Sequence, residues 1–186
     1  MARITQITPE SATGRTKELL DAVKSKFGII PNMTRAMANA PAALDGFLQL
    51  SGALGKGKLT ARIREQIGLA VAQANGCDYC LAAHSAVGRM VGLTDEQIVE
   101  SRSGSAEDPR AAALIRFAIR VLDTKRSVGD IDLKEVRDAG FDDGTIPEVV
   151  ANVALHVFTN YFNRMAETDL DFPKAPQLKP APATTI

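Results

Sequence analysis

The chain has 186 residues, of which 45% are hydrophobic and 24% are charged, and its 22 basic residues are balanced by 22 acidic ones. A chain of this size and composition predicts one globular domain that buries roughly 70% of its unfolded surface, so its core needs neither disulfides nor a structural metal. The zero net charge and the lack of a long basic run argue against nucleic acids and anionic membranes as partners.

No apolar stretch approaches the roughly 18 residues of a membrane-spanning helix, and the first residues contain no apolar signal-peptide core. We therefore expect a cytoplasmic protein without a membrane partner. In the cytosol, the two cysteines are expected to be reduced, catalytic or metal-bound rather than permanently crosslinked.

Helix start and stop signals recur along the whole chain, and no segment shows the alternating pattern of a β-strand. We predict an all-α fold, a single-domain bundle of eight or nine helices. The caps and stops place these helices at Pro9 to Phe27, Asn32 to Asn39, Ala42 to Leu54, Ala61 to Ala74, Cys77 to Val91, a short stretch after Thr94, Pro109 to Leu122, Asp130 to Ala139 and Thr145 to Thr168.

The C-terminal end of the chain has a different composition. Four of the nine prolines fall in its last sixteen residues, and proline excludes a continuous helix there. The sequence thus predicts a helical domain over residues 1–170 and a proline-rich tail over 171–186, either disordered or extended over a neighbouring surface. These prolines are Pro173, Pro176, Pro180 and Pro182.

The two cysteines stand at a predicted helix start, in the motif Cys77-Asp78-Tyr79-Cys80, and His84 follows one turn after Cys80. At about 100° per residue, both thiols and the imidazole share one mostly apolar helix face. Unpaired backbone N–H groups and the helix dipole favour an anion at this end, so a thiol pKa is expected to be lowered toward the reactive range. His84 is within reach of the Cys80 proton.

Glu65 interrupts the pattern of the predicted helix that precedes the cysteines. It belongs to neither the polar stripe nor the main apolar face, so we expect a desolvated carboxyl with a raised pKa that could carry protons. An ion pair with Arg62 or Arg64 is the alternative. A straight hairpin places Glu65 about 16 Å from the turn at Gly76, so the helices must cross, or water must bridge Glu65 to the cysteines.

His156 lies on a stripe of uncharged polar residues in the last predicted helix. Such a stripe could line a pocket or a subunit interface, and plain surface exposure is the alternative. The other members of the stripe are Asn152, Thr159, Asn160 and Asn163.

The spacing of Glu65, Cys77, Cys80 and His84 resembles the active-site pattern of the alkyl hydroperoxidase D family within the carboxymuconolactone decarboxylase superfamily. The surrounding cysteine motif, and the segments 159–164 and 170–173, are similar to the peroxidase-related branch of that superfamily. The resemblance extends from about Pro9 to Pro173. It implies an all-helical fold and a homo-oligomer, commonly a trimer or hexamer.

The resemblance also implies a mechanism. Cys80 would attack a hydroperoxide, Cys77 would resolve the sulfenic acid to a disulfide, and Glu65 and His84 would carry protons. Tyr79 stands where the hydroperoxidases have a histidine, so part of the proton relay is missing or reassigned. No organic cofactor site is visible, so electrons would come from an external dithiol protein or a small thiol.

Two other functions compete with a thiol-dependent peroxidase. Cys77, Cys80, His84 and Glu65 could bind zinc in a structural or interaction module, although structural zinc sites usually have two separated ligand pairs and the chain lacks a second pair. A cofactor-free lyase acting on a lactone through Glu65 and His84 alone is the third possibility. The true lactone decarboxylases of this superfamily lack the CxxC pair, which argues against decarboxylation.

Overall fold

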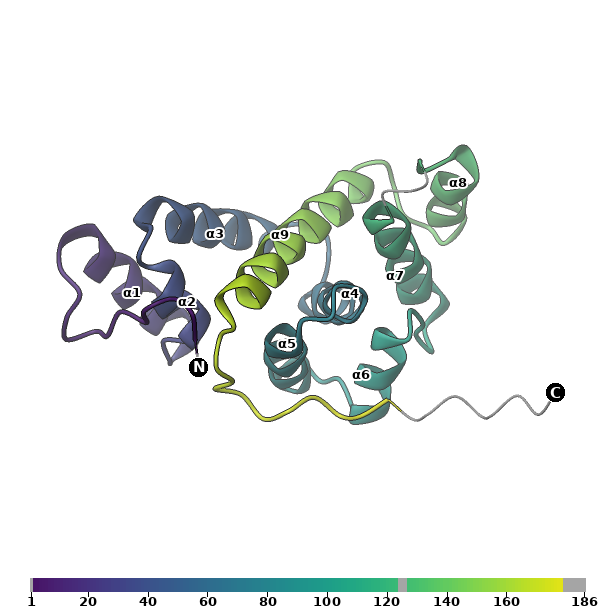
Figure 1. Cartoon of the computed structure of the whole chain (residues 1–186). Coiled ribbons are helices and arrows are strands. Elements are labelled where there is room, and N and C mark those ends of the chain that lie inside the picture. The colour runs from purple at the N-terminus through teal and green to yellow at the C-terminus, as the bar shows by residue number, and fades with distance from the viewer. Residues whose placement is uncertain (1, 124–126, 179–186) are drawn as a thin grey trace.

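The computed structural model describes residues 2–123 and 127–178, and this part of the chain forms nine helices and no strand (Figure 1). The predicted all-α fold is therefore confirmed. The helices are α1 (Gly14–Phe27), α2 (Asn32–Met37), α3 (Pro41–Leu54), α4 (Ala61–Ala74), α5 (Asp78–Met90), α6 (Asp95–Arg102), α7 (Pro109–Leu122), α8 (Asp130–Asp138) and α9 (Thr145–Ala166).

Side-chain caps start three of the central helices where the sequence predicts them. Thr60 accepts a hydrogen bond from the backbone N–H of Ile63, which begins α4, and Thr94 forms a capping box with Gln97 at α6. Asp108 caps α7 ahead of a first-turn proline. These local signals fix the first residues of α4, α6 and α7.

The first helix begins later than its sequence signal indicates. It starts at Gly14, because Thr8 and Ser11 form a turn in which the Ser11 N–H and hydroxyl both donate to the Thr8 carbonyl. Hydrogen bonds of this local kind compete with helix formation. The predicted end is correct, since Gly28 closes α1 with φ 76° in the left-handed region.

Helix α4 is the centre of the molecule, in contact with α5, α6, α7 and α9 (Figure 1). Its residues Ile67 and Val71 lie in a core cluster with α7 and α9, and Leu69 lies in a second cluster that includes both cysteines. Helices α1 to α3 form a third cluster beside α9. The cysteine pair is therefore built into the core instead of standing on a surface loop.

The described part of the C-terminal segment is extended and runs across α5 and α6 (Figure 1). The Asp171 carboxylate accepts a hydrogen bond from the backbone N–H of Asn32 at the start of α2, at 2.6 Å. The Phe172 ring meets Tyr79 edge-on, and the Arg102 guanidinium donates to the carbonyl of Pro176. The extended alternative is thus observed to residue 178, and Pro180 and Pro182 lie outside the described residues.

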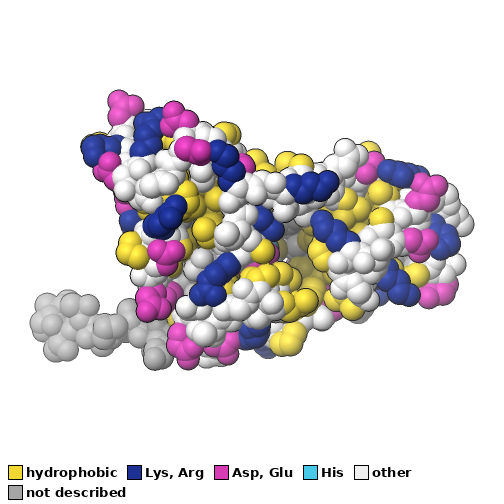
Figure 2. Space-filling view, turned by 180° about the vertical axis from the view of Figure 1, so that it is seen from behind, with side chains coloured by type: hydrophobic (Ala, Val, Ile, Leu, Met, Phe, Trp, Pro, Cys, Tyr) yellow, Lys and Arg dark blue, Asp and Glu magenta, His cyan; other side chains and the backbone are white. Residues whose placement is uncertain are grey.

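The surface carries mixed charge, as the balanced composition predicts. Figure 2 shows Lys and Arg side chains interspersed with Asp and Glu on one face, with apolar side chains between them. Of the helices in the described ranges, none has the length and apolarity that crossing a bilayer requires.

Candidate active site

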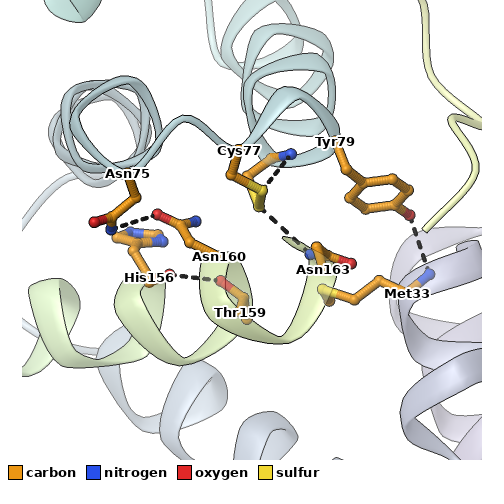
Figure 3. The surroundings of a disulfide bond; sticks show 9 residues. Met33, Asn75, Cys77, Tyr79, His156, Thr159, Asn160 and Asn163 are labelled. Carbon is orange, nitrogen blue, oxygen red and sulfur yellow. Dashed lines mark hydrogen bonds between the residues drawn. A yellow bond between two sulfur atoms is a disulfide. The ribbon is translucent and has the colours of Figure 1, made fainter. Parts of the chain in front are cut away.

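Cys77 and Cys80 form a disulfide at the N-terminus of α5 (Figure 3). Cys77 is the N-cap of the helix, and its Sγ accepts a hydrogen bond from the backbone N–H of Cys80 at 3.2 Å. The preceding Gly76 has φ 61°, a left-handed conformation that lets the chain turn from α4 into α5. Both cysteines are buried, with 1% and 3% of their surface exposed.

A cavity of about 200 Å³ opens beside the second cysteine. Cys80 lines this cavity, whereas Cys77 does not. Several polar side chains line the cavity, and the rest of its lining is mostly apolar. The polar lining includes Glu65, His84, His156 and Asn163, and the apolar walls include Phe27, Phe47, Leu54, Leu155 and Phe172.

Glu65 and His84 form a hydrogen-bonded pair on the wall of the cavity. Glu65 Oε2 lies 2.7 Å from His84 Nδ1, and each side chain is 18% exposed. The imidazole lies against Gly68, where a Cβ would be only 2.8 Å from the ring carbon Cε1. The glycine thus lets His84 pack against α4 beside Glu65, and both side chains line the cavity.

The alternative partners of Glu65 are engaged elsewhere. Arg62 donates to the Gly92 carbonyl and to Gln97, and Arg64 donates to the Leu59 carbonyl. Among the described residues, neither arginine forms an ion pair with Glu65. In this fold, the partner of Glu65 is therefore His84.

The polar stripe of α9 is buried and faces the same cavity. His156 packs edge-on against His84, with 4.7 Å between ring centroids. The pKa of His156 is lowered well below its usual value, first because burial disfavours the charged imidazolium and then because His84 is adjacent. Surface exposure is therefore wrong for this stripe. Its members Asn152, His156, Thr159 and Asn163 line the cavity, whereas Asn160 is bonded to Asn75.

Asn163 makes a contact that the sequence analysis missed. Its Nδ2 donates to Cys80 Sγ at 3.4 Å (Figure 3). The polar stripe is the sequence signal that could have identified Asn163 as buried. Nothing in one sequence, however, pairs α9 with a cysteine 83 positions earlier.

Tyr79 links the cysteine helix to α2. Its hydroxyl accepts a hydrogen bond from the backbone N–H of Met33 at 3.2 Å (Figure 3), and the side chain is buried. The pKa of Tyr79 is raised above its usual value, chiefly because burial disfavours the phenolate, with a contribution from the Asp171 carboxylate. Tyr79 is therefore a neutral phenol in the cavity wall.

The four residues predicted as possible zinc ligands form bonds with one another. The two sulfurs share the disulfide, and His84 binds Glu65. Across residues 2–123 and 127–178, no group of three or more His, Cys, Asp or Glu side chains is placed to hold a metal ion.

Comparison with known proteins gives one family and several similar folds. Residues 41–124 match the sequence model of the carboxymuconolactone decarboxylase family. Among curated proteins, none is significantly similar to this chain in sequence.

Three solved structures illustrate the fold. A peroxidase-related protein with an alkylhydroperoxidase core from Ralstonia eutropha JMP134 is 24% identical, with a TM-score of 0.83, over 91% of this chain and 92% of that chain. A peroxidase-related protein from Silicibacter sp. TM1040 is also 24% identical, with a TM-score of 0.73, over 83% of both chains. The debrominase Bmp8, as a variant bound to 2,3,4-tribromopyrrole, is 15% identical, with a TM-score of 0.77, over 90% of this chain and 91% of that chain.

Proposed function

Residues 41–124, which carry the cysteine pair, match the sequence model of the carboxymuconolactone decarboxylase family, and from this premise we propose that the protein is a thiol-dependent peroxidase. One observation carries the proposal. Cys77 and Cys80 form a disulfide, and only Cys80 lines the adjacent cavity. A substrate in the cavity would contact Cys80, and Cys77, which lies outside the cavity lining, would act as the resolving thiol. The Glu65–His84 pair supplies a proton carrier on the same wall.

In the first step, the Cys80 thiolate attacks the distal oxygen of a hydroperoxide. An S–O bond forms and the O–O bond breaks, so that the sulfur is oxidised to a sulfenic acid and the alkoxide leaves. The alkoxide takes a proton and departs as an alcohol. A position in the first turn of α5, where backbone N–H groups are unpaired, favours the thiolate that this step requires.

In the second step, the Cys77 thiolate attacks the Cys80 sulfur. The S–S bond forms, the S–O bond breaks, and the hydroxide takes a proton and leaves as water. One hydroperoxide and two thiols thus give one alcohol, one water and one disulfide. The Cys77–Cys80 disulfide of the structure is the product that this proposed step would form.

Proton transfer is assigned to His84 with Glu65 behind it. The imidazole takes the proton of the Cys80 thiol and gives it to the leaving oxygen, while the carboxylate at 2.7 Å orients the ring and stabilises its charged form. Tyr79 holds α5 against α2 and remains a neutral hydrogen-bonding partner at this site. A catalytic role for Tyr79, which stands at the position of the histidine of the hydroperoxidases, stays a prediction.

A dithiol must return the electrons, since each turnover oxidises both cysteines. We assign this role to an external dithiol protein or a small thiol, in a reducing compartment such as the cytosol. Each exchange consumes one dithiol, or two molecules of a small thiol, and releases the corresponding disulfide.

We also propose a homo-oligomer, a trimer or hexamer. Large apolar side chains remain exposed along α9, among them Val150, Phe158, Tyr161 and Met165. An apolar stripe of this kind on a soluble helical protein supports a contact between subunits. Light scattering of the purified chain should give the mass of an assembly, and a monomer at micromolar concentration would contradict the proposal.

The peroxidase proposal is tested by counting thiols. One equivalent of an alkyl hydroperoxide added to the reduced protein should consume both thiols, whereas the Cys77→Ser variant should lose one thiol and accumulate a trappable sulfenic acid. Cys80→Ser is the matched control and should keep its thiol. If both thiols persist in the wild type, the proposal fails.

A cofactor-free lyase is the second candidate, because the Glu65–His84 pair lines the cavity independently of the sulfurs. A protein with both cysteines replaced by serine separates the two. Such a variant should lose all reaction with hydroperoxide, and turnover of a carboxylated lactone by it would favour the lyase.

A further inference from the structure

We propose that Asn163 is a further catalytic residue, one that stabilises the Cys80 thiolate and binds the hydroxyl end of the hydroperoxide. The inference rests on the proposed peroxidase function. It assigns a hydroxyl-binding subsite to α9, a helix that lies outside the segment matched to the family.

The position of Asn163 supports both roles. The side chain is 3% exposed and lines the cavity, and its Nδ2 donates to Cys80 Sγ at 3.4 Å. Its Oδ1 is buried and has no hydrogen-bond partner among the described residues. A buried acceptor without a partner costs free energy, so an unpaired oxygen beside the reacting sulfur points to a donor that arrives with the substrate.

The electrostatics of the cavity indicate why this residue matters. Burial keeps His156 in its neutral form, so this second imidazole brings no positive charge to the sulfur. The Cys80 thiolate then depends on the start of α5, on His84 and on the amide of Asn163. A hydrogen bond to a charged acceptor is stronger than a neutral one, so the amide favours the thiolate over the thiol.

The free oxygen of the same amide can accept the O–H of the hydroperoxide. With Nδ2 on the sulfur and Oδ1 on the hydroxyl, one rigid side chain holds nucleophile and distal oxygen side by side. Positioning of this kind lowers the entropic part of the barrier.

The test uses Asn163→Ala and Asn163→Asp in a Cys77→Ser background, where Cys80 is the only thiol. Alkylation at varied pH should show the Cys80 pKa raised by about one unit in the alanine variant, and further in the aspartate variant, which replaces the donor with a negative charge. The second-order rate constant with hydroperoxide at pH 7 should fall at least tenfold. Asn160→Ala removes a buried asparagine of α9 that does not line the cavity, and it should leave the Cys80 pKa unchanged.

An unchanged pKa and rate constant in both Asn163 variants would overturn the inference and leave the peroxidase function standing. The aspartate variant keeps the size of the side chain, so the comparison survives if the alanine variant does not fold. If the wild type itself ignores hydroperoxide, the peroxidase function falls, and the pKa comparison alone decides whether Asn163 stabilises the thiolate.

A second inference comes from a different residue of the cavity. Arg64 is the one lysine or arginine among the described lining residues, and we infer that it binds a carboxylate of the substrate. Its Nη1 donates to the Leu59 carbonyl at 2.6 Å, and within the described ranges the guanidinium takes part in no ion pair. An arginine fork has further donors, and a carboxylate is the partner that fits their geometry.

The α4–α5 hairpin separates this cation from the sulfur. Arg64 lies twelve residues before Gly76 and Cys80 lies four residues after it. The two residues thus come from different levels of the hairpin, and both line the cavity. Because most of the cavity lining is apolar, the site suits an amphiphilic hydroperoxide whose carboxylate and peroxide are joined by an alkyl chain, such as a fatty-acid hydroperoxide.

Linoleic acid hydroperoxide and its methyl ester distinguish this substrate class. The wild type should have a kcat/KM for the acid about tenfold above that for the ester, as a charged hydrogen bond predicts. Arg64→Met should remove that preference, whereas Arg62→Met, at a position outside the cavity lining, should keep it. A wild type that treats acid and ester alike would overturn this inference without touching the peroxidase function, and so would a preference that survives in Arg64→Met.

Discussion

His156 places a second imidazole deep inside the candidate site. The side chain is buried, its Nε2 has no partner among the described residues, and its ring meets that of His84. Because burial lowers the pKa of His156, the residue is neutral at physiological pH and its charge is not available to the sulfurs. The acid–base role in the proposed mechanism is therefore assigned to His84, which alone of the two imidazoles has a carboxylate partner.

The lowered pKa predicts how acid affects stability. Between the folded pKa of His156 and the unfolded value near 6.5, the unfolded chain binds one proton more than the folded chain, so the free energy of unfolding falls as pH falls, by at most about 1.4 kcal/mol per pH unit. His156→Gln removes this contribution. Urea unfolding at pH 5, 6 and 7 should therefore show a shallower loss in the variant than in the wild type.

The comparison isolates one residue because His84 and Glu65 are present in both proteins. Equal slopes in the two proteins would mean that His156 is protonated as readily in the folded state as in the unfolded chain.

At the scale of elements, the crossing of α4 and α5 depends on Gly68. Glycine to alanine inside a helix usually stabilises by up to about 1 kcal/mol. Here the new Cβ would lie 2.8 Å from His84 Cε1, so we expect Gly68→Ala to destabilise by about 1–3 kcal/mol and to displace the imidazole from Glu65. Urea unfolding and the rate of thiol loss with hydroperoxide measure the two effects.

Gly46→Ala is the matched control. Gly46 lies inside α3 with no atom within 4 Å of its added Cβ, so the same substitution there should stabilise and leave the rate of thiol loss unchanged. A Gly68→Ala protein that is as stable and reactive as the wild type would contradict the close approach of the two helices.

Prediction from the sequence succeeded where the information is local. The Thr60 and Thr94 hydroxyls accept hydrogen bonds from backbone N–H groups three residues later, so these helix caps can be predicted from the sequence. His84 follows Cys80 by one helical turn, so their common helix face can be predicted from their spacing. The start of α1 failed because Ser11 offers a competing local hydrogen bond. The contact of Asn163 with Cys80 could not be predicted, since it depends on how two distant helices pack.

At the scale of the whole molecule, the C-terminal segment joins parts that are far apart in sequence. It connects α2 through Asp171, the cysteine helix through Phe172 and α6 through Pro176. Phe172 also lines the cavity, so the C-terminal segment contributes directly to the candidate site.

Asp171→Ala should loosen this segment. The carboxylate accepts the first N–H of α2 as a helix cap does, and losing such a cap costs about 0.5–2 kcal/mol. We expect a lower free energy of unfolding and faster alkylation of the reduced cysteines. Asp169→Ala provides the control, because Asn32 contacts only the backbone carbonyl of that residue, and a protein in which both substitutions have the same effect would argue against the capping role.

The burial of the disulfide has a kinetic consequence. With 1% and 3% of the two cysteines exposed, a bulky protein reductant cannot contact either sulfur in the closed molecule, so its attack must follow an opening motion. Turnover would then rise with reductant concentration only until the opening rate limits it, whereas a slender dithiol that enters the cavity escapes this ceiling. If the proposed mechanism holds, recycling speed and conformational rigidity are opposed, and substitutions that loosen the C-terminal segment should raise the first and lower the second.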